Sequence, residues 1–194
     1  MRTQARNQRH ALLQWPVVVA AVRQHLDEVI ADLDRRVAAL EAAIAAVLAE
    51  SAWAESLVCL TSAPGIGLVT ASWLLVGTLN FALCPGPESL TAYAGLAPMP
   101  RESGRSVRGR PSIGHDGHGR LRTALYMATL SAARCNPAIK AFYQRLRAAG
   151  KPMKVARCAA ARKLLHQAWA LGSKLQRFDP EHKQQHDTLP ELAA

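Results

Sequence analysis

A serine among arginines is the part of this sequence best suited to covalent chemistry. Ser103 lies in Glu102-Ser103-Gly104. The flanking arginines are Arg101, Arg105, Arg108 and Arg110. A serine hydroxyl that attacks a phosphodiester needs nearby positive charge, because negative charge develops on the phosphoryl oxygens. A serine before a glycine is also a common turn residue, so composition alone leaves a catalytic role and a turn role open.

No part of the sequence predicts a bound metal or cofactor. His115, Asp116 and His118 stand close together, but three such residues in a glycine-rich stretch are weak support for ligation. The four cysteines form no Cys-x-x-Cys pair, which disfavours both a zinc ribbon and a disulfide framework. We therefore interpret the cysteines as small apolar residues in a reducing compartment.

The net charge of +10 comes from one segment of the chain. Residues 101–178 hold 17 basic residues against Glu102 and Asp116, whereas residues 58–100 hold no Lys or Arg. Such a block predicts a polyanionic partner, with nucleic acid the best candidate, through neutralisation of phosphates. Codon bias in a GC-rich genome would explain the excess of Arg over Lys, but it would not explain why the charge is segregated.

Helical segments should present part of this charge. A helix is expected over residues 120–135, with Arg120 and Arg122 in its first turn. A longer helix should open at Lys151-Pro152 and run to about Phe178. Lys151, Lys154 and Arg157 recur at every third position of its start and would follow a phosphate backbone. The alternative is an ordinary solvated helix face.

A second candidate nucleic-acid contact is the turn Pro64-Gly65-Ile66-Gly67. It stands between two expected helices and is typical of a helix-hairpin-helix element. Gly65 and Gly67 would let the backbone approach a phosphate, and N–H groups at the start of the following helix would bind it. A plain corner between two helices is the alternative.

The composition predicts a mainly all-α fold, because 36 of the apolar residues are Ala and only 5% of the chain is aromatic. We expect a basic N-terminal segment (1–15), a coiled-coil helix (16–56), a compact helical domain (57–178) and a disordered tail (179–194). The polar stretch 101–119, with its glycines and arginines, is expected to be a long functional loop. A short hairpin around 107–113 is an option within it.

Apolar residues along the first long helix form a heptad seam. The members are Leu26, Ile30, Leu33, Val37, Leu40, Ile44 and Val47. β-Branched residues at alternate seam positions, with mostly Leu between them, favour a two-stranded parallel coiled coil. Residues 26–47 are therefore expected to form a homodimer or a mixed dimer, and packing within one chain is the alternative.

The sequence favours neither a membrane span nor export. Its apolar runs are short and interrupted by charged residues. Arg2, Arg6 and Arg9 precede the apolar run 15–22, but Pro16 splits that run and no clear cleavage site follows. We expect a cytoplasmic, nucleoid-associated protein.

Several motifs in order give the chain a family resemblance. They are Pro-Gly-Ile-Gly-x-x-x-Ala (64–71), Tyr-Ala-Gly-Leu-Ala-Pro (93–98), Glu-Ser-Gly with Arg-Gly-Arg (102–110), Leu-Arg-x-Ala-Leu-Tyr-Met-Ala (121–128), Asn-Pro-Ala-Ile-Lys-Ala-Phe-Tyr-Gln-Arg-Leu (136–146), Ala-Gly-Lys-Pro-x-Lys-Val-Ala (149–156) and Arg-Lys-Leu-Leu (162–165). Together they resemble the C-terminal half of bacterial insertion-sequence transposases of the one-ten family, relatives of the Piv DNA invertases. The resemblance covers about residues 5–178.

The resemblance implies a composite recombinase. In that family a RuvC-like domain binds Mg²⁺ through four carboxylates, and a coiled coil joins it to a C-terminal domain that supplies a serine nucleophile. The active site is shared between protomers, and a structured RNA guides recombination. The matching serine is Ser103.

This sequence departs from the family pattern because it begins just before the coiled coil, without the RuvC-like domain. Only Glu88, Glu102 and Asp116 supply carboxylates between residues 58 and 178. The implied Mg²⁺ would therefore belong to a RuvC-like domain acting in trans. The alternative is a truncated, non-catalytic remnant that dimerises and binds DNA or guide RNA.

Overall fold

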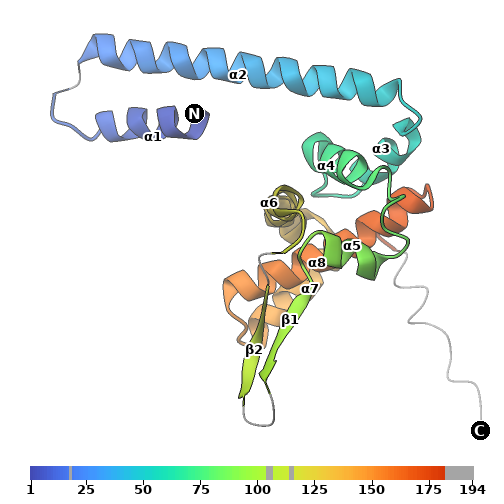
Figure 1. Cartoon of the computed structure of the whole chain (residues 1–194). Coiled ribbons are helices and arrows are strands. Elements are labelled where there is room, and N and C mark those ends of the chain that lie inside the picture. Colours follow the sequence, from blue (N-terminus) through green and yellow to red (C-terminus); the bar gives the residue numbers. More distant parts are fainter. Residues whose placement is uncertain (18, 104–106, 114–115, 182–194) are drawn as a thin grey trace, which may run out of the picture. The chain divides into compact units, whose positions relative to one another are not determined.

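The computed structural model describes residues 1–17, 19–103, 107–113 and 116–181, and of residues 100–112 it describes the backbone alone. Gly104, Arg105, His115 and the tail from 182 onward, which the predictions above name, lie outside the described part of the chain. The chain forms two compact units, Met1–Val47 and Leu48–Ala194. Helices make up most of both units, which confirms the mainly all-α prediction (Figure 1).

The first unit is a pair of helices rather than one helix with a basic extension. Helix α1 (Arg2–Leu12) lies alongside α2 (Ala20–Ala49) (Figure 1). Side-chain ion pairs join the two: Arg6 Nη2 is 2.8 Å from Asp34 Oδ2, and Arg9 Nη1 is 2.9 Å from Asp27 Oδ1. The N-terminal arginines are therefore engaged with carboxylates of the same unit.

The heptad seam lies on α2, a single uninterrupted helix. Within this unit Ile30 is 7% exposed, so the chain itself covers the seam at that point. Farther along, Leu40 and Val47 are 64% and 69% exposed. The part of the seam nearer the end of α2 is therefore open to a partner.

The second unit is built around α8 (Met153–Ser173). Four helices pack against it: α3 (Ala54–Thr61), α5 (Pro87–Tyr93), α6 (Gly119–Cys135) and α7 (Pro137–Ala148). Helix α4 (Leu68–Thr78) packs against α3 and α6. Leu164 and Leu165 of α8 are fully buried, and buried alanines on the same helix let its neighbours approach closely.

Helix α8 ends at Ser173, earlier than the predicted end at Phe178. Leu175 adopts a left-handed conformation with φ 52°, and the Gln176 N–H donates to the Leu171 carbonyl. This is a common way for a helix to end. The chain then returns toward α3, where the Phe178 N–H donates to Ser62 Oγ at 2.8 Å.

The stretch expected to be a long loop is largely a β-hairpin. Strand β1 (Pro98–Ser103) pairs antiparallel with β2 (Val107–Ile113), and the hairpin projects from the helices of its unit (Figure 1). The register is irregular between Met99 and Arg101. Pro100 and Pro111 fall in this irregular region, where a residue without an N–H group costs no ladder hydrogen bond. The glycines and prolines of this stretch favoured a loop, whereas its residues pair from Ser103 with Val107 out to Pro98 with Ile113.

In the described part of the chain, none of the helices has the length and apolar character needed to cross a membrane.

Candidate nucleic-acid interface

The Pro64–Gly67 turn joins α3 to α4 as predicted, but its two glycines differ in their surroundings. Gly65 has φ +102°, and a Cβ built on it would lie 2.7 Å from Ala132 Cα and 2.8 Å from Ala132 N. Gly65 is therefore a packing residue that lets the turn contact α6. Gly67 is exposed, is the N-cap of α4, and has nothing within 4 Å of a built Cβ.

A buried asparagine fixes this turn against the helical core. Asn136 Nδ2 donates to Gln167 Oε1 at 2.8 Å on α8 and to the Pro64 carbonyl at 3.4 Å. Its Oδ1 accepts the Ile139 N–H, so the same side chain caps α7. All the polar groups of this fully buried amide face partners from three segments, which holds the turn in place.

The hairpin carries the predicted serine and three of its arginines. Ser103 is the last residue of β1 and pairs with Val107, while Arg101 pairs with Gly109 and Glu102 with Arg108. Arg110 lies in β2. The backbone therefore brings positions 101, 103 and 108 together on two adjacent strands, near the tip of the hairpin (Figure 1).

Arg122 and His118 anchor the chain where the hairpin meets α6. Arg122 Nη1 donates to the carbonyls of Asp116 at 2.9 Å and Gly95 at 3.3 Å. The His118 N–H donates to the Tyr93 carbonyl at 2.7 Å, and His118 Nδ1 accepts the Leu121 N–H as a helix cap. Arg122 was predicted to contact nucleic acid, whereas its guanidinium is engaged with the backbone.

His118 was considered in the sequence analysis as a metal ligand or base, and in the structure its Nδ1 is used to cap α6. Its ring also contacts Trp73 and Tyr93, each with ring centroids 5.8 Å from the imidazole. Arg120 lies over the Trp73 ring, with its guanidinium carbon 6.0 Å from the ring centroid. Arg120 therefore remains a surface cation, supported by an aromatic ring.

The residues described contain no group of three or more His, Cys, Asp or Glu side chains that could hold a metal ion. The carboxylate set that the family resemblance requires for Mg²⁺ is therefore not matched by these residues, and we derive no metal-dependent step from them. The four cysteines are free, with Cys59 and Cys84 buried and Cys135 exposed.

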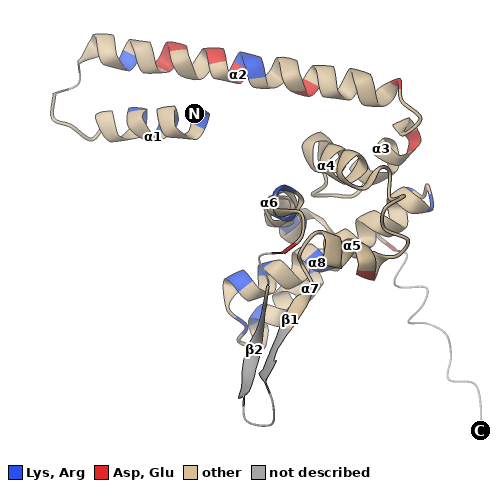
Figure 2. Cartoon of the chain, in the orientation of Figure 1, with Lys and Arg blue, Asp and Glu red and all other residues tan. Residues whose placement is uncertain are grey.

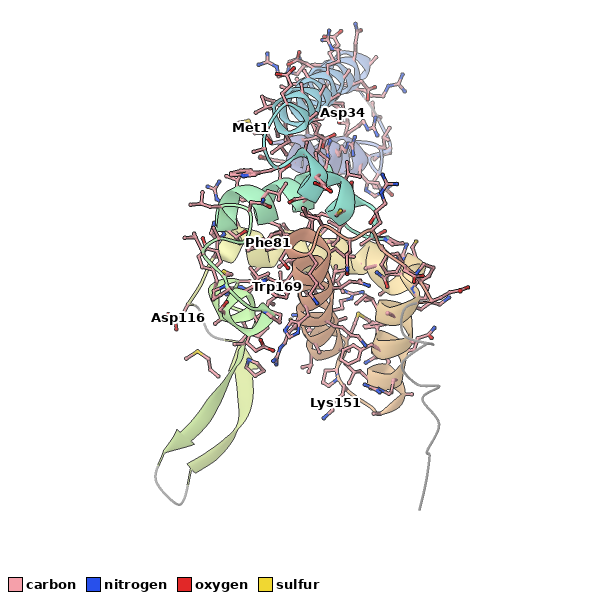
Figure 3. The ribbon with its side chains drawn as sticks, turned by 90° about the vertical axis from the view of Figure 1, so that its right-hand side faces the viewer. Met1, Asp34, Phe81, Asp116, Lys151 and Trp169 are labelled. Atoms are coloured by element: carbon pink, nitrogen blue, oxygen red, sulfur yellow. The ribbon has the colours of Figure 1, made fainter. Side chains whose placement is uncertain are left out.

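The start of α8 presents the predicted basic residues. Lys151 and Lys154 are exposed, and Lys151 lies at the edge of the unit (Figure 3). Arg157 is oriented by two neighbours that sequence reasoning did not assign to the site: a hydrogen bond to Tyr126 raises the pKa of its guanidinium, and Tyr143 adds to this effect. Both tyrosines fall within the motifs 121–128 and 136–146, and an aromatic residue beside basic ones was the available signal.

Positive charge in this unit is concentrated on α6, α7 and α8, whereas α4 carries none (Figure 2). The ion pairs of Arg2, Arg6, Arg9, Arg35 and Arg36 with aspartates all lie in the first unit. Among the described residues of the second unit, Arg120, Lys154 and Arg157 have no ion-pair partner. Cations without protein counterions are suited to binding phosphates.

A helical domain with a projecting hairpin and basic residues that have no ion-pair partner has a surface suited to a polyanion. Comparison with known proteins is more specific. Residues 58–144 match the family described as "Transposase IS116/IS110/IS902 family". The chain therefore carries a domain of this transposase family.

Three relatives illustrate how far the similarity extends. The chain is 34% identical over 112 residues to an insertion element IS110 uncharacterized 43.6 kDa protein of Streptomyces coelicolor, covering 58% of this chain and 27% of that protein. It is 36% identical over 121 residues to a pilin gene-inverting protein of Moraxella bovis, covering 62% and 38%. An insertion element IS900 uncharacterized 42 kDa protein of Mycobacterium paratuberculosis is 30% identical over 169 residues, covering 87% and 41%. The chain thus spans well under half the length of these relatives.

Proposed function

We propose that this chain forms the DNA-holding part of a recombinase that transposes or inverts DNA, and that it contributes Ser103 as the nucleophile. The observation that carries the proposal is the set of unpaired cations on α6 and α8 in the same unit as the hairpin that bears Ser103. The family match and the pilin gene-inverting relative support the same class of reaction.

In the proposed reaction, the Ser103 hydroxyl oxygen bonds to a phosphorus of DNA. One P–O bond of the phosphodiester breaks, and the proton lost by the Ser103 hydroxyl ends on the released sugar oxygen, which becomes a hydroxyl. Guanidinium groups near the hairpin would stabilise the charge on the phosphoryl oxygens during this step. Metal-dependent chemistry would come from a RuvC-like domain, as the resemblance implies, and a guide RNA would share the basic surface with DNA.

DNA affinity should fall steeply as salt is added, because each neutralised phosphate releases counterions. We expect Lys151→Gln and Arg157→Gln each to reduce the slope of log K against log salt by about 1. The measurement is fluorescence anisotropy with a short duplex over a range of salt concentrations. Arg35→Gln is the control, since Arg35 lies on α2 and already pairs with Asp32 at 3.3 Å. A shallow slope for the unsubstituted protein would contradict the proposed DNA contacts.

We further propose that the open part of the α2 seam pairs with a second copy of the chain. Leu40 and Val47 are exposed apolar residues that continue the register of the covered Ile30. Replacing both with Glu should convert a dimer into a monomer in sedimentation velocity, because two charges would have to be buried in the interface. Exchanging the exposed Ala42 and Ala46 for Glu is the control. A concentration-independent monomer for the unsubstituted protein would count against the coiled coil.

A further inference from the structure

A groove of about 730 Å³ lies at the foot of the hairpin, at the opposite end of the strands from Ser103, and it shares Lys154 with the proposed DNA-binding surface. Leu96, Pro98 and Ile113 form its side toward the hairpin. Phe142 of α7 and Val155, Cys158 and Ala159 of α8 line the remainder. Its size is in the range of sites that hold small organic molecules.

Its apolar surface is accessible rather than hidden in the core. Val155 is 53% exposed, and Cys158, Ala159, Ile113 and Phe142 are half-buried. Aliphatic and aromatic side chains left in contact with water favour a ligand with a flat or apolar surface.

The charged side chains around the groove are all basic. Lys154, Arg162 and Lys163 line it together with the imidazole of His166, and no carboxylate of the described residues does. Lys163 Nζ lies 4.6 Å from the centroid of the Phe142 ring, so one cation stands directly beside the aromatic wall. A ligand that complements this groove combines an apolar, planar body with a negative charge.

The imidazole at the inner end of the groove adds a polar contact. His166 Nε2 lies 2.9 Å from Thr91 Oγ1. Burial lowers the pKa of His166, and the nearby Arg162 lowers it further, against the opposing effect of Glu88. The ring is therefore a neutral hydrogen-bonding group at physiological pH, while Lys154 and Arg162 supply the positive charge.

We infer that this groove binds one unpaired nucleotide of a single-stranded nucleic acid, with the base against the apolar walls and its phosphate on Lys154 and Arg162. The chemistry matches the general mode of single-strand binding, in which bases contact apolar and aromatic side chains and cations follow the backbone. Bases in an intact duplex are stacked and paired, so they would not reach the groove. The inference rests on the proposed nucleic-acid-binding function and assigns it a second, single-strand-specific site.

The test compares single-stranded and duplex affinity in a variant that fills the groove. Ala159→Leu adds an apolar side chain at a half-buried position of α8 with little cost to the helix. It should weaken binding of a thymidine 12-mer by about tenfold and leave binding of a duplex unchanged. Ala141→Leu, at an exposed position of α7 outside the groove, is the matched control and should change neither affinity. Thermal melting checks that both variants are folded.

A second measurement locates the ligand without any substitution. Cys158 lines the groove and Cys135 is exposed at the end of α6, so one chain contains both the reporter and its reference. Bound oligonucleotide should slow maleimide labelling of Cys158 severalfold and leave labelling of Cys135 unchanged, as followed by peptide mass spectrometry. Parallel arms with oligo-dT and oligo-U tell whether the nucleotide comes from DNA or RNA.

The outcomes separate this inference from the function on which it rests. If Ala159→Leu reduces single-strand and duplex affinity equally, or reduces neither while duplex binding remains salt-dependent, the groove site is wrong and the proposed function stands. Laurate, an apolar anion without a base, is the comparison ligand in the labelling experiment. If laurate protects Cys158 and neither oligonucleotide does, the proposed nucleotide site is wrong. Absence of affinity for any nucleic acid would overturn the proposed function itself.

Discussion

Ser103→Ala is expected to abolish covalent attachment of the protein to DNA while changing duplex affinity less than about twofold, because phosphate contacts set that affinity. The substitution removes the only atom that would bond to phosphorus and leaves the strand pairing of Ser103 with Val107 intact, because that pairing uses the backbone. Loss of the nucleophile should lower strand exchange by at least about 10³-fold. The measurement mixes the chain with a separately made RuvC-like domain, Mg²⁺, guide RNA and nicked target DNA, and resolves adducts on a denaturing gel.

Ser112→Ala is the matched control for this experiment. Ser112 lies in the same hairpin and pairs with Met99 at the opposite end from Ser103, so the same chemical change is made away from the reacting position. The control should form adduct at the rate of the unsubstituted protein. An adduct that persists in Ser103→Ala would refute the assigned nucleophile. If the unsubstituted protein binds DNA and forms no adduct, the chain is a binding module instead.

The helices of the second unit could be predicted from local signals. Asn136-Pro137 ends one helix and starts the next, and the structure shows the reason: Asn136 caps α7 and proline needs no hydrogen-bond partner at its first position. Lys151-Pro152 precedes α8 in a similar way. Such boundaries depend on residues a few positions apart, which is why sequence patterns locate them.

Helix α1 was not predicted, whereas a hairpin was predicted only as an option around 107–113 within an expected loop. Helix α1 buries little beyond Ala5, so it has no apolar periodicity to detect. Its arginines occur at positions 2, 6 and 9, on one helical face, and pair with Asp27 and Asp34, which are one heptad apart. That charge complementarity was the available signal. The strands of the hairpin contain prolines and glycines, which are depleted in strands and therefore favoured a loop over most of 101–119.

The basic residues of the candidate site could be predicted from the sequence, whereas their surroundings could not. Arg122 and Arg157 belong to the same basic segment, yet Arg122 donates to two backbone carbonyls and the half-buried Arg157 interacts with Tyr126 and Tyr143. A pattern of charges cannot distinguish these roles, because the difference depends on which carbonyls and hydroxyls the fold brings within reach.

Gly65→Ala is expected to lower the free energy of unfolding by about 3 kcal/mol or more. Gly65 has φ +102°, which L-residues rarely adopt, and the added Cβ would meet the backbone of Ala132 rather than a side chain able to move. Equilibrium urea denaturation measures the change. Gly67→Ala, two residues away, is the matched control: its φ is −91° and no atom lies within 4 Å of a built Cβ. It should cost less than about 1 kcal/mol.

Equal stability of the Gly65 and Gly67 variants would show that the turn does not contact α6 as described. The two glycines correspond to the two interpretations of this turn: Gly65 serves the packing of a helical corner, and Gly67 is the candidate phosphate contact. Gly65 is required for packing whether or not DNA is bound, so weaker DNA binding by Gly65→Ala would not identify a contact. Gly67, exposed at the start of α4, is the glycine of the pair at which a change in phosphate binding can be measured on an intact fold.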